Sequence, residues 1–304
     1  MEKYLAFKCF RHLLSHRKRE TLKKRLKHVL SEFIPHNKAM QVSNSYDIIG
    51  DIAVIRLPPD CKDDQQEIAQ AIMSIHKNVK TVMAQTSAVQ GEYRTRRLVH
   101  VAGEERSVTQ YMESRCVFSL DVTGCYFPPR LSYERMLVAK QIKNGEVVVN
   151  MFAGVGCFSL IIARHSDVSK LYSIDINPIA FKFMEKNVRI NRVYGKVIPL
   201  LGDAKEIIET RLCHSADRVL MPLPEKALEY LPSAVSALKE NGGWIHYYDF
   251  EHAGKGECPV EKNKLKVAEK LRDVGVPFGL SYGRVVRPTG PNWHQIALDI
   301  LVSR

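Results

Sequence analysis

Residues 146–163 read EVVVNMFAGVGCFSLIIA, and this stretch decides the fold class. An apolar run typical of a buried strand leads into Gly154-x-Gly156, and a helical pattern begins directly behind the second glycine. Glycines at such a turn let the backbone approach a ligand closely and direct the helix N-terminus toward it. The stretch therefore predicts a ligand-binding strand, turn and helix, although a tight turn without a ligand would also fit.

The ligand predicted for this turn carries no pyrophosphate. A dinucleotide site favours a third glycine three residues after Gly156, and that position holds Ser159. Polar Asn150 precedes the turn. The arrangement Asn-x-x-x-Gly-x-Gly suits S-adenosylmethionine, because the amino-acid end of that molecule is zwitterionic and has no phosphate.

Acidic residues follow at the next two predicted strand ends. LYSIDINP (171–178) contains Asp175 about twenty residues beyond the glycines, where an acid reaches the hydroxyls of an adenosine ribose. LLGDAKE (200–206) places Asp203 where it can accept a hydrogen bond from the adenine amine. Each acid alone is more simply a helix N-cap. The three consecutive strand ends together predict an adenosyl pocket. An NAD-dependent dehydrogenase is the alternative, but the sequence lacks the glycine loop that would bind the phosphates of NAD.

The predicted cofactor site extends to the neighbours of these positions. Its candidate residues are Asn150, Phe152, Gly154, Gly156, Asp175, Ile176, Asp203, Ala204 and Pro222.

Three segments are expected along the chain. Residues 113–304 alternate short apolar runs with helical patterns, which is typical of an α/β, doubly wound, mostly parallel sheet of the Rossmann type. Residues 41–112 predict a small α+β domain, with VTQYMESRCVFSLDV (108–122) interpreted as a strand. Residues 1–40 predict a basic helical segment, in which RETLKKRLKHVLSEFI (19–34) ends at Pro35 and the following HNKAM. The apolar face of that helix comprises Leu22, Leu26, Val29, Leu30 and Phe33.

Composition limits the class of protein. The 304 residues are 45% hydrophobic and 26% charged, as in ordinary globular proteins, and no apolar run reaches the ~20 residues that cross a bilayer. The N-terminus does not resemble a secretory signal. Seven cysteines without a Cys-x-x-Cys pair indicate reduced thiols in the cytoplasm and no zinc site. Residues 1–40 hold eleven Lys or Arg against three acids, so about +8 of the net charge of +12 lies there, which favours a polyanionic partner.

Six motifs, in this order, resemble the archaeal and eukaryotic tRNA (guanine-37 N1)-methyltransferases: SYDIIGDIAVI, GEYRTR, YFPPRLSYER, NMFAGVGCFS, IDINP and MPLPE. The resemblance runs from about residue 45 to the end and is nearest to the archaeal subgroup that also methylates the wyosine precursor. It implies a small RNA-facing domain, a Rossmann-type class I methyltransferase domain over 113–304 that binds S-adenosylmethionine, and methylation of the guanosine 3′ of the anticodon. Family members often carry a further N-terminal domain that reads the tRNA elbow, and we expect it to be absent here or reduced to the basic helix.

The resemblance also implies roles for individual residues. Guanine N1 carries a proton at neutral pH, so a base must remove that proton while a cation or dipole stabilises the charge on O6. The family's base falls on Glu134 in SYERM, its O6-stabilising arginine on Arg94 in EYRTR, and a tyrosine near the target on Tyr126 in GCYFPPR. Without the motifs, Glu134 would be a first-turn helix acid and Arg94 a surface strand residue.

The expected partner is the anticodon loop of tRNA, and the enzyme is expected to be a monomer. Further residues would contact the RNA. The target base must leave its stack, and Tyr126, Phe127 or Tyr248 could receive it. His246 and His294 have no partners at metal-ligand spacing, so both are predicted to be structural. Candidates for phosphate contact are Arg94, Arg96, Arg97, Arg130, Arg284 and Arg287.

Pro222 stands where typical members of this family have asparagine in an Asn-Leu-Pro loop. Asparagine offers a side-chain carbonyl and amide to the base, whereas proline offers only a backbone carbonyl and a fixed φ. We expect N1 methylation to survive this change and discrimination at the base edge to relax. Methylation of C7 of the tricyclic wyosine precursor (4-demethylwyosine) at the same position is therefore a second hypothesis. A basic RNA-binding protein without catalysis is a third.

Overall fold

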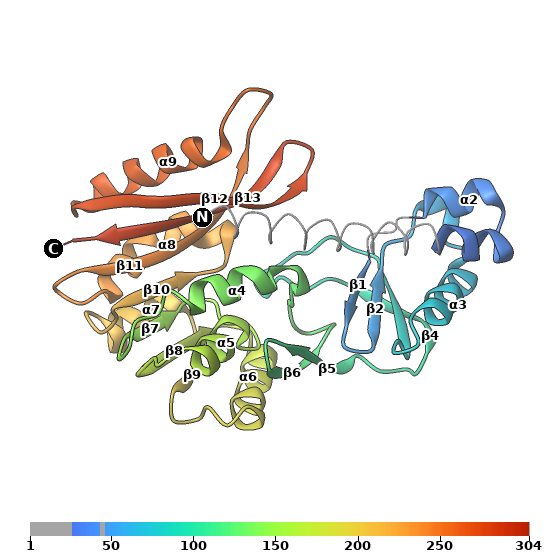
Figure 1. Cartoon of the computed structure of the whole chain (residues 1–304), viewed down its shortest axis with the longest axis horizontal. Helices are drawn as coiled ribbons and strands as arrows, with labels where there is room; N and C mark the ends of the chain where they lie inside the picture. The colour runs from blue at the N-terminus through green and yellow to red at the C-terminus, as the bar shows by residue number, and fades with distance from the viewer. Residues whose placement is uncertain (1–25, 43–45, 304) are drawn as a thin grey trace, which may run out of the picture. The chain divides into compact units, whose positions relative to one another are not determined.

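The computed structural model describes residues 26–42 and 46–303, which fall into two compact units (Figure 1). Unit 1 ends at Tyr111 and also takes in Asp121–Thr123, while unit 2 comprises Met112–Leu120 and the chain from Gly124 onward. No helix within the described ranges is both long and apolar enough to span a membrane.

Unit 1 is a mixed sheet in the order β1-β2-β3-β4, formed by β1 (Asp47–Ile49), β2 (Ile52–Ile55), β3 (Thr81–Gln85) and β4 (Leu98–Gly103). The parallel pair β2 and β3 is joined through α3 (Gln65–Ile75), and the other two pairings are antiparallel. The predicted α+β character of this region is confirmed. A 3-10 turn spans Pro59–Cys61.

The helix expected over 19–34 is seen from residue 26 to residue 33, and its earlier part lies outside the described residues. Leu26 and Leu30 are buried in the unit 1 core, as the apolar spacing predicts, but Phe33 is 49% exposed. The helix ends before Pro35, as expected, but HNKAM is itself helical, because the separate helix α2 (His36–Gln41) begins directly after Pro35. Ile34 fills the core position that Phe33 was expected to take.

The stretch 108–122 is not one strand but a hairpin of β5 (Val108–Glu113) and β6 (Cys116–Asp121). Ser114 and Arg115 between them both have positive φ, 48° and 61°. Two consecutive residues of this kind form the tight turn that reverses a hairpin. Neither residue is glycine or asparagine, so the usual sequence signal for such a turn is missing.

Unit 2 contains a sheet in the order β12-β13-β11-β10-β7-β8-β9, in which β7 to β11 are parallel and β13 is antiparallel to both neighbours. The predicted doubly wound, mostly parallel sheet is confirmed. Its strands are β7 (Val147–Asn150), β8 (Lys170–Asp175), β9 (Val197–Leu201), β10 (Arg218–Met221), β11 (Gly243–His252), β12 (Phe278–Gly290) and β13 (Trp293–Val302).

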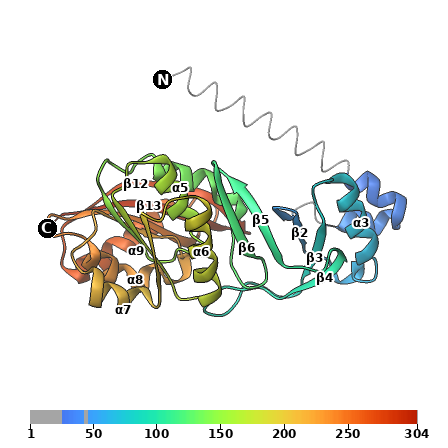
Figure 2. The same ribbon diagram turned by 90° about the horizontal axis from the view of Figure 1, so that it is seen from below.

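Helices cover both faces of this sheet, with α5 on one side and α8 and α9 on the other (Figure 2). The helices are α4 (Ser132–Ala139, after a 3-10 turn at Pro129–Leu131), α5 (Cys157–His165), α6 (Pro178–Ile190), α7 (Ala204–Ile207, continued as a π-helix over Ile208–Leu212), α8 (Pro224–Ala237) and α9 (Pro259–Val274). Under α8 and α9, strand residues such as Val219 and Ile245 form the main apolar core. The carboxyl ends of β7 to β10 meet at one edge of the sheet, where ligands bind in such folds.

Candidate functional site

The predicted glycine turn lies between β7 and α5. Gly154 and Gly156 have φ of 57° and 91°, and Gly156 is the N-cap of α5. A Cβ on Gly156 would approach Leu160 Cδ1 to 3.1 Å, so this glycine serves both conformation and packing. A Cβ on Gly154 would meet only the carbonyl oxygen of Tyr126, at 3.8 Å. The turn therefore leaves open space beside Gly154 and brings Tyr126 to its rim.

Asp175, at the end of β8, is bound directly to this turn. Its Oδ2 accepts the Gly154 N–H at 2.6 Å, and its Oδ1 accepts the Asn177 N–H at 3.0 Å. Burial raises the pKa of Asp175, and the two backbone hydrogen bonds oppose that effect. Each carboxylate oxygen keeps a second acceptor position, which suits the two hydroxyls of a ribose.

Asn150 is fully buried beneath the turn. Its Nδ2 donates to Ser159 Oγ at 3.1 Å, whereas its Oδ1 has no hydrogen-bond partner within the described part of the chain. Buried amide oxygens are nearly always paired in folded proteins. An orphaned acceptor below an open glycine turn fits a ligand that brings its own donor, such as the ammonium of S-adenosylmethionine.

Asp203 is the N-cap of α7, which is the simpler of its two expected roles. Its Oδ1 accepts the N–H groups of Lys205 and Glu206 at 2.8 and 3.2 Å. Its Oδ2 accepts the hydroxyl of Tyr230 at 2.5 Å. The Tyr230 ring stands edge-on to Phe152, with centroids 5.3 Å apart. Tyr230 was not predicted, because no sequence motif connects α8 to these strand ends; contact of Asp203 with adenine stays a prediction.

Three remaining cofactor candidates lie at the same strand ends. Ile176 follows Asp175, Ala204 opens α7, and Pro222 follows β10. Asn177, also missed, caps α6 by accepting the N–H of Ile179 at 2.9 Å. The polar residue before a proline in IDINP is the signal that could have identified this cap.

Glu134 lies in the first turn of α4 and is only 4% exposed. Arg284 donates to it from Nη2 to Oε2 at 2.6 Å and from Nε to Oε1 at 3.2 Å. The hydroxyl of Tyr248 donates to Oε2 at 3.3 Å, and the ring of Tyr248 packs on Phe158 of α5, with centroids 5.9 Å apart. Glu134 is therefore connected by two contacts to the helix that the glycine turn begins.

Three RNA-contact expectations do not fit this geometry. The Arg284 side chain is 10% exposed and ion-paired, so it cannot contact phosphate as it stands. Phe127 and Tyr248 are 3% and 1% exposed, and both pack against other side chains. Of the three aromatic candidates, Tyr126 alone is partly exposed and stays a candidate to receive the base. His246 is buried among polar side chains, in agreement with a structural role.

Arg94 lies in unit 1, in a turn between β3 and β4 and not in a strand. Its φ is 53°, and its N–H donates to the carbonyl of Gly91 at 3.1 Å. Positive φ is uncommon in residues other than glycine and concentrates at functional sites. The turn supports a special role for Arg94, and its joint action with Glu134 stays a prediction.

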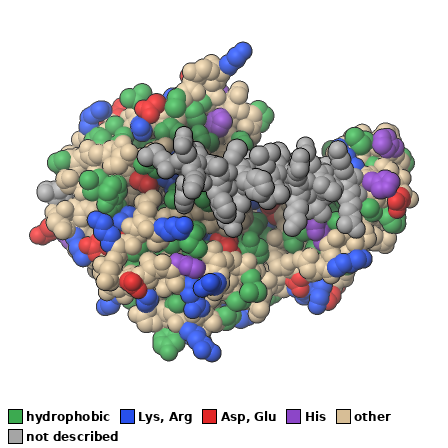
Figure 3. Space-filling view, in the orientation of Figure 1, with side chains coloured by type: hydrophobic (Ala, Val, Ile, Leu, Met, Phe, Trp, Pro, Cys, Tyr) green, Lys and Arg blue, Asp and Glu red, His purple; other side chains and the backbone are tan. Residues whose placement is uncertain are grey.

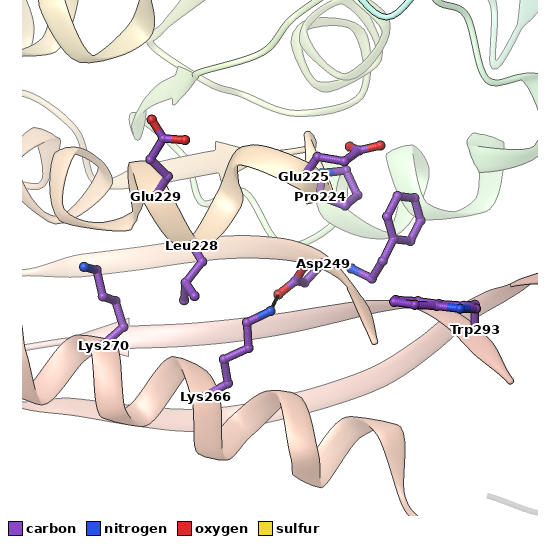
Figure 4. Close-up of a pocket in the computed structure, with 9 residues that line it drawn as sticks. Pro224, Glu225, Leu228, Glu229, Asp249, Lys266, Lys270 and Trp293 are labelled. Carbon is purple, nitrogen blue, oxygen red and sulfur yellow. Dashed lines mark hydrogen bonds and ion pairs between the residues drawn. The ribbon is translucent and has the colours of Figure 1, made fainter. Parts of the chain in front are cut away.

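A pocket of about 710 Å³ opens between α8 and α9 (Figure 4). Its lining residues are Pro224, Glu225, Leu228, Glu229, Asp249, Phe250, Lys266, Lys270 and Trp293. None of the predicted site residues is among them. Lys266 is bound to Asp249 at 2.8 Å, and the other charged side chains are of both signs, so we assign no ligand to this pocket. Among the described residues no cluster of His, Cys, Asp and Glu could hold a metal ion.

Comparison with known proteins identifies the family of the chain. The TRM5/TYW2 methyltransferase domain matches residues 109–276, and the TYW2 N-terminal domain matches residues 26–106. The tRNA (guanine(37)-N(1))-methyltransferase Trm5b of Pyrococcus abyssi is 41% identical over 89% of this chain and 78% of that protein. The crystal structure of Trm5b from this organism superposes with a TM-score of 0.79 at 40% identity, over 89% of this chain and 78% of that one.

Other relatives carry different activities in their names. The tRNA 4-demethylwyosine(37)-methyltransferase Taw21 of Saccharolobus solfataricus is 40% identical over 84% of this chain and 92% of that protein. A structure of Pyrococcus horikoshii TYW2 in complex with MeSAdo has a TM-score of 0.75 at 26% identity, over 92% of this chain and 99% of that one. The chain belongs to the TRM5/TYW2 methyltransferase family.

Proposed function

We propose that this enzyme transfers the methyl group of S-adenosylmethionine to N1 of guanosine 37 in tRNA. The observation that carries the proposal is the placement of Glu134: a buried carboxylate, connected through Tyr248 and Phe158 to the helix of the glycine turn. A nitrogen that is protonated at neutral pH needs such a base beside the methyl donor. The name of the Pyrococcus abyssi relative agrees with this substrate.

The residues of this chain would divide the work as follows. Asp175 would bind the ribose, the open turn at Gly154 would receive the adjoining part of the cofactor, and Asn150 Oδ1 would accept from its ammonium. When bound, S-adenosylmethionine supplies a methyl group on a positively charged sulfur. Glu134 would accept the N1 proton, and Arg94 would stabilise the charge that develops on O6.

The surface of α6 supports tRNA as the partner. Lys182, Lys186 and Arg189 are exposed along this helix at spacings of four and three residues, which places them on one face. None of the ion pairs found within the described ranges involves these three cations, and Lys186 stands over the ring of Phe183, 5.9 Å from its centroid. Basic side chains gather over α5 and α6 in the view of Figure 3. Unpaired cations on one face are suited to phosphate groups of RNA.

Three finer points belong to the proposal. The anticodon loop is the part of the tRNA that carries position 37 and so must enter the site. We place the enzyme in the cytoplasm, since its six described cysteines are free thiols. We also expect a monomer, because unit 2 alone contains the cofactor residues and Glu134.

The test is incubation of the enzyme with methyl-tritiated S-adenosylmethionine and transcripts that carry guanosine or adenosine at position 37. Nucleoside analysis should find 1-methylguanosine from the first transcript and no product from the second. Methylation of the adenosine transcript, or label elsewhere in the tRNA, would overturn the assignment.

A second candidate is methylation of C7 of 4-demethylwyosine at the same position. Two observations favour it: Pro222 in place of the usual asparagine, and the 40% identity to Taw21. A tRNA that contains the tricyclic base serves as its substrate. Nucleoside analysis of the two substrates separates the candidates, because one yields 1-methylguanosine and the other yields the tricyclic base with a methyl group on C7.

A further inference from the structure

A chain of buried polar side chains extends from Glu134 across one face of the unit 2 sheet. Arg284 of β12 binds Glu134 and also donates from Nη1 to Asp299 Oδ2 at 3.4 Å. Asp299 Oδ1 lies 2.7 Å from His246 Nδ1, and His246 Nε2 lies 2.8 Å from Arg218 Nη1. Arg218 in turn is paired with Glu146, from Nε to Oε2 at 2.9 Å.

The direction of each hydrogen bond in this chain is fixed. Arginine only donates, so His246 Nε2 must be the acceptor and the proton must be on Nδ1, which donates to Asp299. Burial lowers the pKa of His246, which keeps the ring neutral in this role. Burial opposes ionisation of Asp299, but its hydrogen bond with His246 and the charge of Arg284 hold its pKa below the usual range. Asp299 therefore presents a negative charge to Arg284 from the side opposite Glu134.

The two oxygens of Glu134 are not equivalent. Oε2 accepts from Tyr248 at 3.3 Å and from Arg284 Nη2 and Nε at 2.6 and 3.1 Å. Oε1 receives only the Arg284 Nε–H, at 3.2 Å, among the contacts of the described residues. Burial raises the pKa of Tyr248, so its hydroxyl stays a donor.

We infer that Arg284 is a positioning residue for the proposed methyl transfer: held by Asp299, it saturates Oε2 of Glu134 and leaves Oε1 to accept the substrate proton. This inference rests on Glu134 as the base. A guanidinium is suited to the task because its planar fork fixes the rotation of the carboxylate, whereas a lysine ammonium would supply charge without that geometry.

The experiment compares Arg284→Lys, Arg284→Gln and Asp299→Asn under saturating tRNA and cofactor. We expect kcat to fall about a hundredfold in Arg284→Gln, the scale of a misplaced reacting group. Asp299→Asn should lose about tenfold, as is typical of outer hydrogen-bond partners. The dissociation constants for S-adenosylmethionine and tRNA should change less than about threefold, because neither ligand is expected to contact these side chains.

The split between kcat and ligand affinity separates positioning from general destabilisation. The charged groups around Glu134 are Arg284 and, behind it, Asp299, with the neutral hydroxyl of Tyr248 from β11. In Arg284→Lys the positive charge remains but the planar fork is lost, so kcat should fall while both dissociation constants stay near those of the wild type.

The control is Lys239→Gln, which breaks the ion pair with Asp217 at 2.7 Å, beside the start of β10 and away from Glu134. It should keep the kcat of the wild type. Unchanged kcat in folded Arg284→Gln would overturn the inference, as would a loss explained wholly by weaker ligand binding. A wild type that forms no 1-methylguanosine would refute the proposed substrate instead, and the same variants would then be compared on whichever transfer the enzyme performs.

Discussion

Glu134→Gln tests whether Glu134 is the general base. The expected loss of rate and the expected loss of stability can be estimated separately. Removal of a general base slows a reaction by about 10²–10⁴, which corresponds to about 2.7–5.5 kcal/mol of activation free energy. Loss of one partner from a buried ion pair costs about 3–5 kcal/mol of stability. The cost here should be about 1–3 kcal/mol, because glutamine keeps an acceptor oxygen for Arg284 and Asp299 remains 3.4 Å from that arginine.

Single-turnover methylation of a guanosine-37 transcript measures the first effect, and urea unfolding measures the second. Calorimetry with S-adenosylmethionine supplies the control: the predicted cofactor residues Asn150, Gly154 and Asp175 are unchanged, so binding should stay within about twofold of the wild type. Wild-type turnover in the variant would refute the role of Glu134. A rate loss that simply parallels lost cofactor affinity would do the same, because it would place Glu134 in binding and not in proton transfer.

Three further predictions concern the frame of the site. Asn187→Ala removes three buried hydrogen bonds, one from the Ser119 N–H at 2.7 Å and one each to the Ser119 and Val155 carbonyls at 3.0 Å. Each hydrogen bond contributes about 0.5–1.5 kcal/mol, so urea unfolding should show a free energy of unfolding lower by about 1.5–4.5 kcal/mol. A loss below about 0.5 kcal/mol would contradict the role of these hydrogen bonds. Burial raises the pKa of Asp175, so S-adenosylmethionine should bind more weakly on acidification, and this weakening should start at a higher pH than for an exposed aspartate. Titration calorimetry should find that the dissociation constant depends on pH in the wild type and does not in Asp175→Asn. Pro222→Asn should raise methylation of guanosine relative to the tricyclic base, and an unchanged ratio in competition would remove the discriminating role of this position.

The parts of the site that the sequence predicted are those encoded by neighbouring residues. The glycine turn and the acid at Asp175 depend on strand, turn and helix patterns within about ten residues, and the structure joins them through the Gly154–Asp175 hydrogen bond. The hairpin turn at Ser114 and Arg115 was missed because positive φ there has no glycine or asparagine to signal it. Asp203 shows a different limit: a residue that ends a strand and begins a helix fits both a ligand role and a cap, and sequence alone cannot separate them.

The ion pair of Glu134 with Arg284 could not be predicted, because the two residues are 150 positions apart. A charged residue in an amphipathic strand resembles a surface residue, which is why the sequence predicts a phosphate contact for Arg284. Its burial follows from topology: β13 is antiparallel to both β11 and β12, which brings Asp299 level with His246 and carries Arg284 back over α4.

Because of this topology, β11, β12 and β13 hold the carboxylate of Glu134, a role that their sequence does not indicate. The predicted cofactor residues lie at the ends of β7, β8, β9 and β10, whereas the groups that hold Glu134 come from β11, β12 and β13. The carboxylate on α4 is thus bound to the half of the sheet opposite the ribose site, and α5, through Phe158 and Tyr248, is the connection between the halves. A change of substrate within this family need not alter the cofactor half. We expect it to arise from small shifts at Arg284 or Pro222, which would change how the target nucleobase meets Glu134 and the loop after β10 while Asp175 keeps its predicted role toward the cofactor.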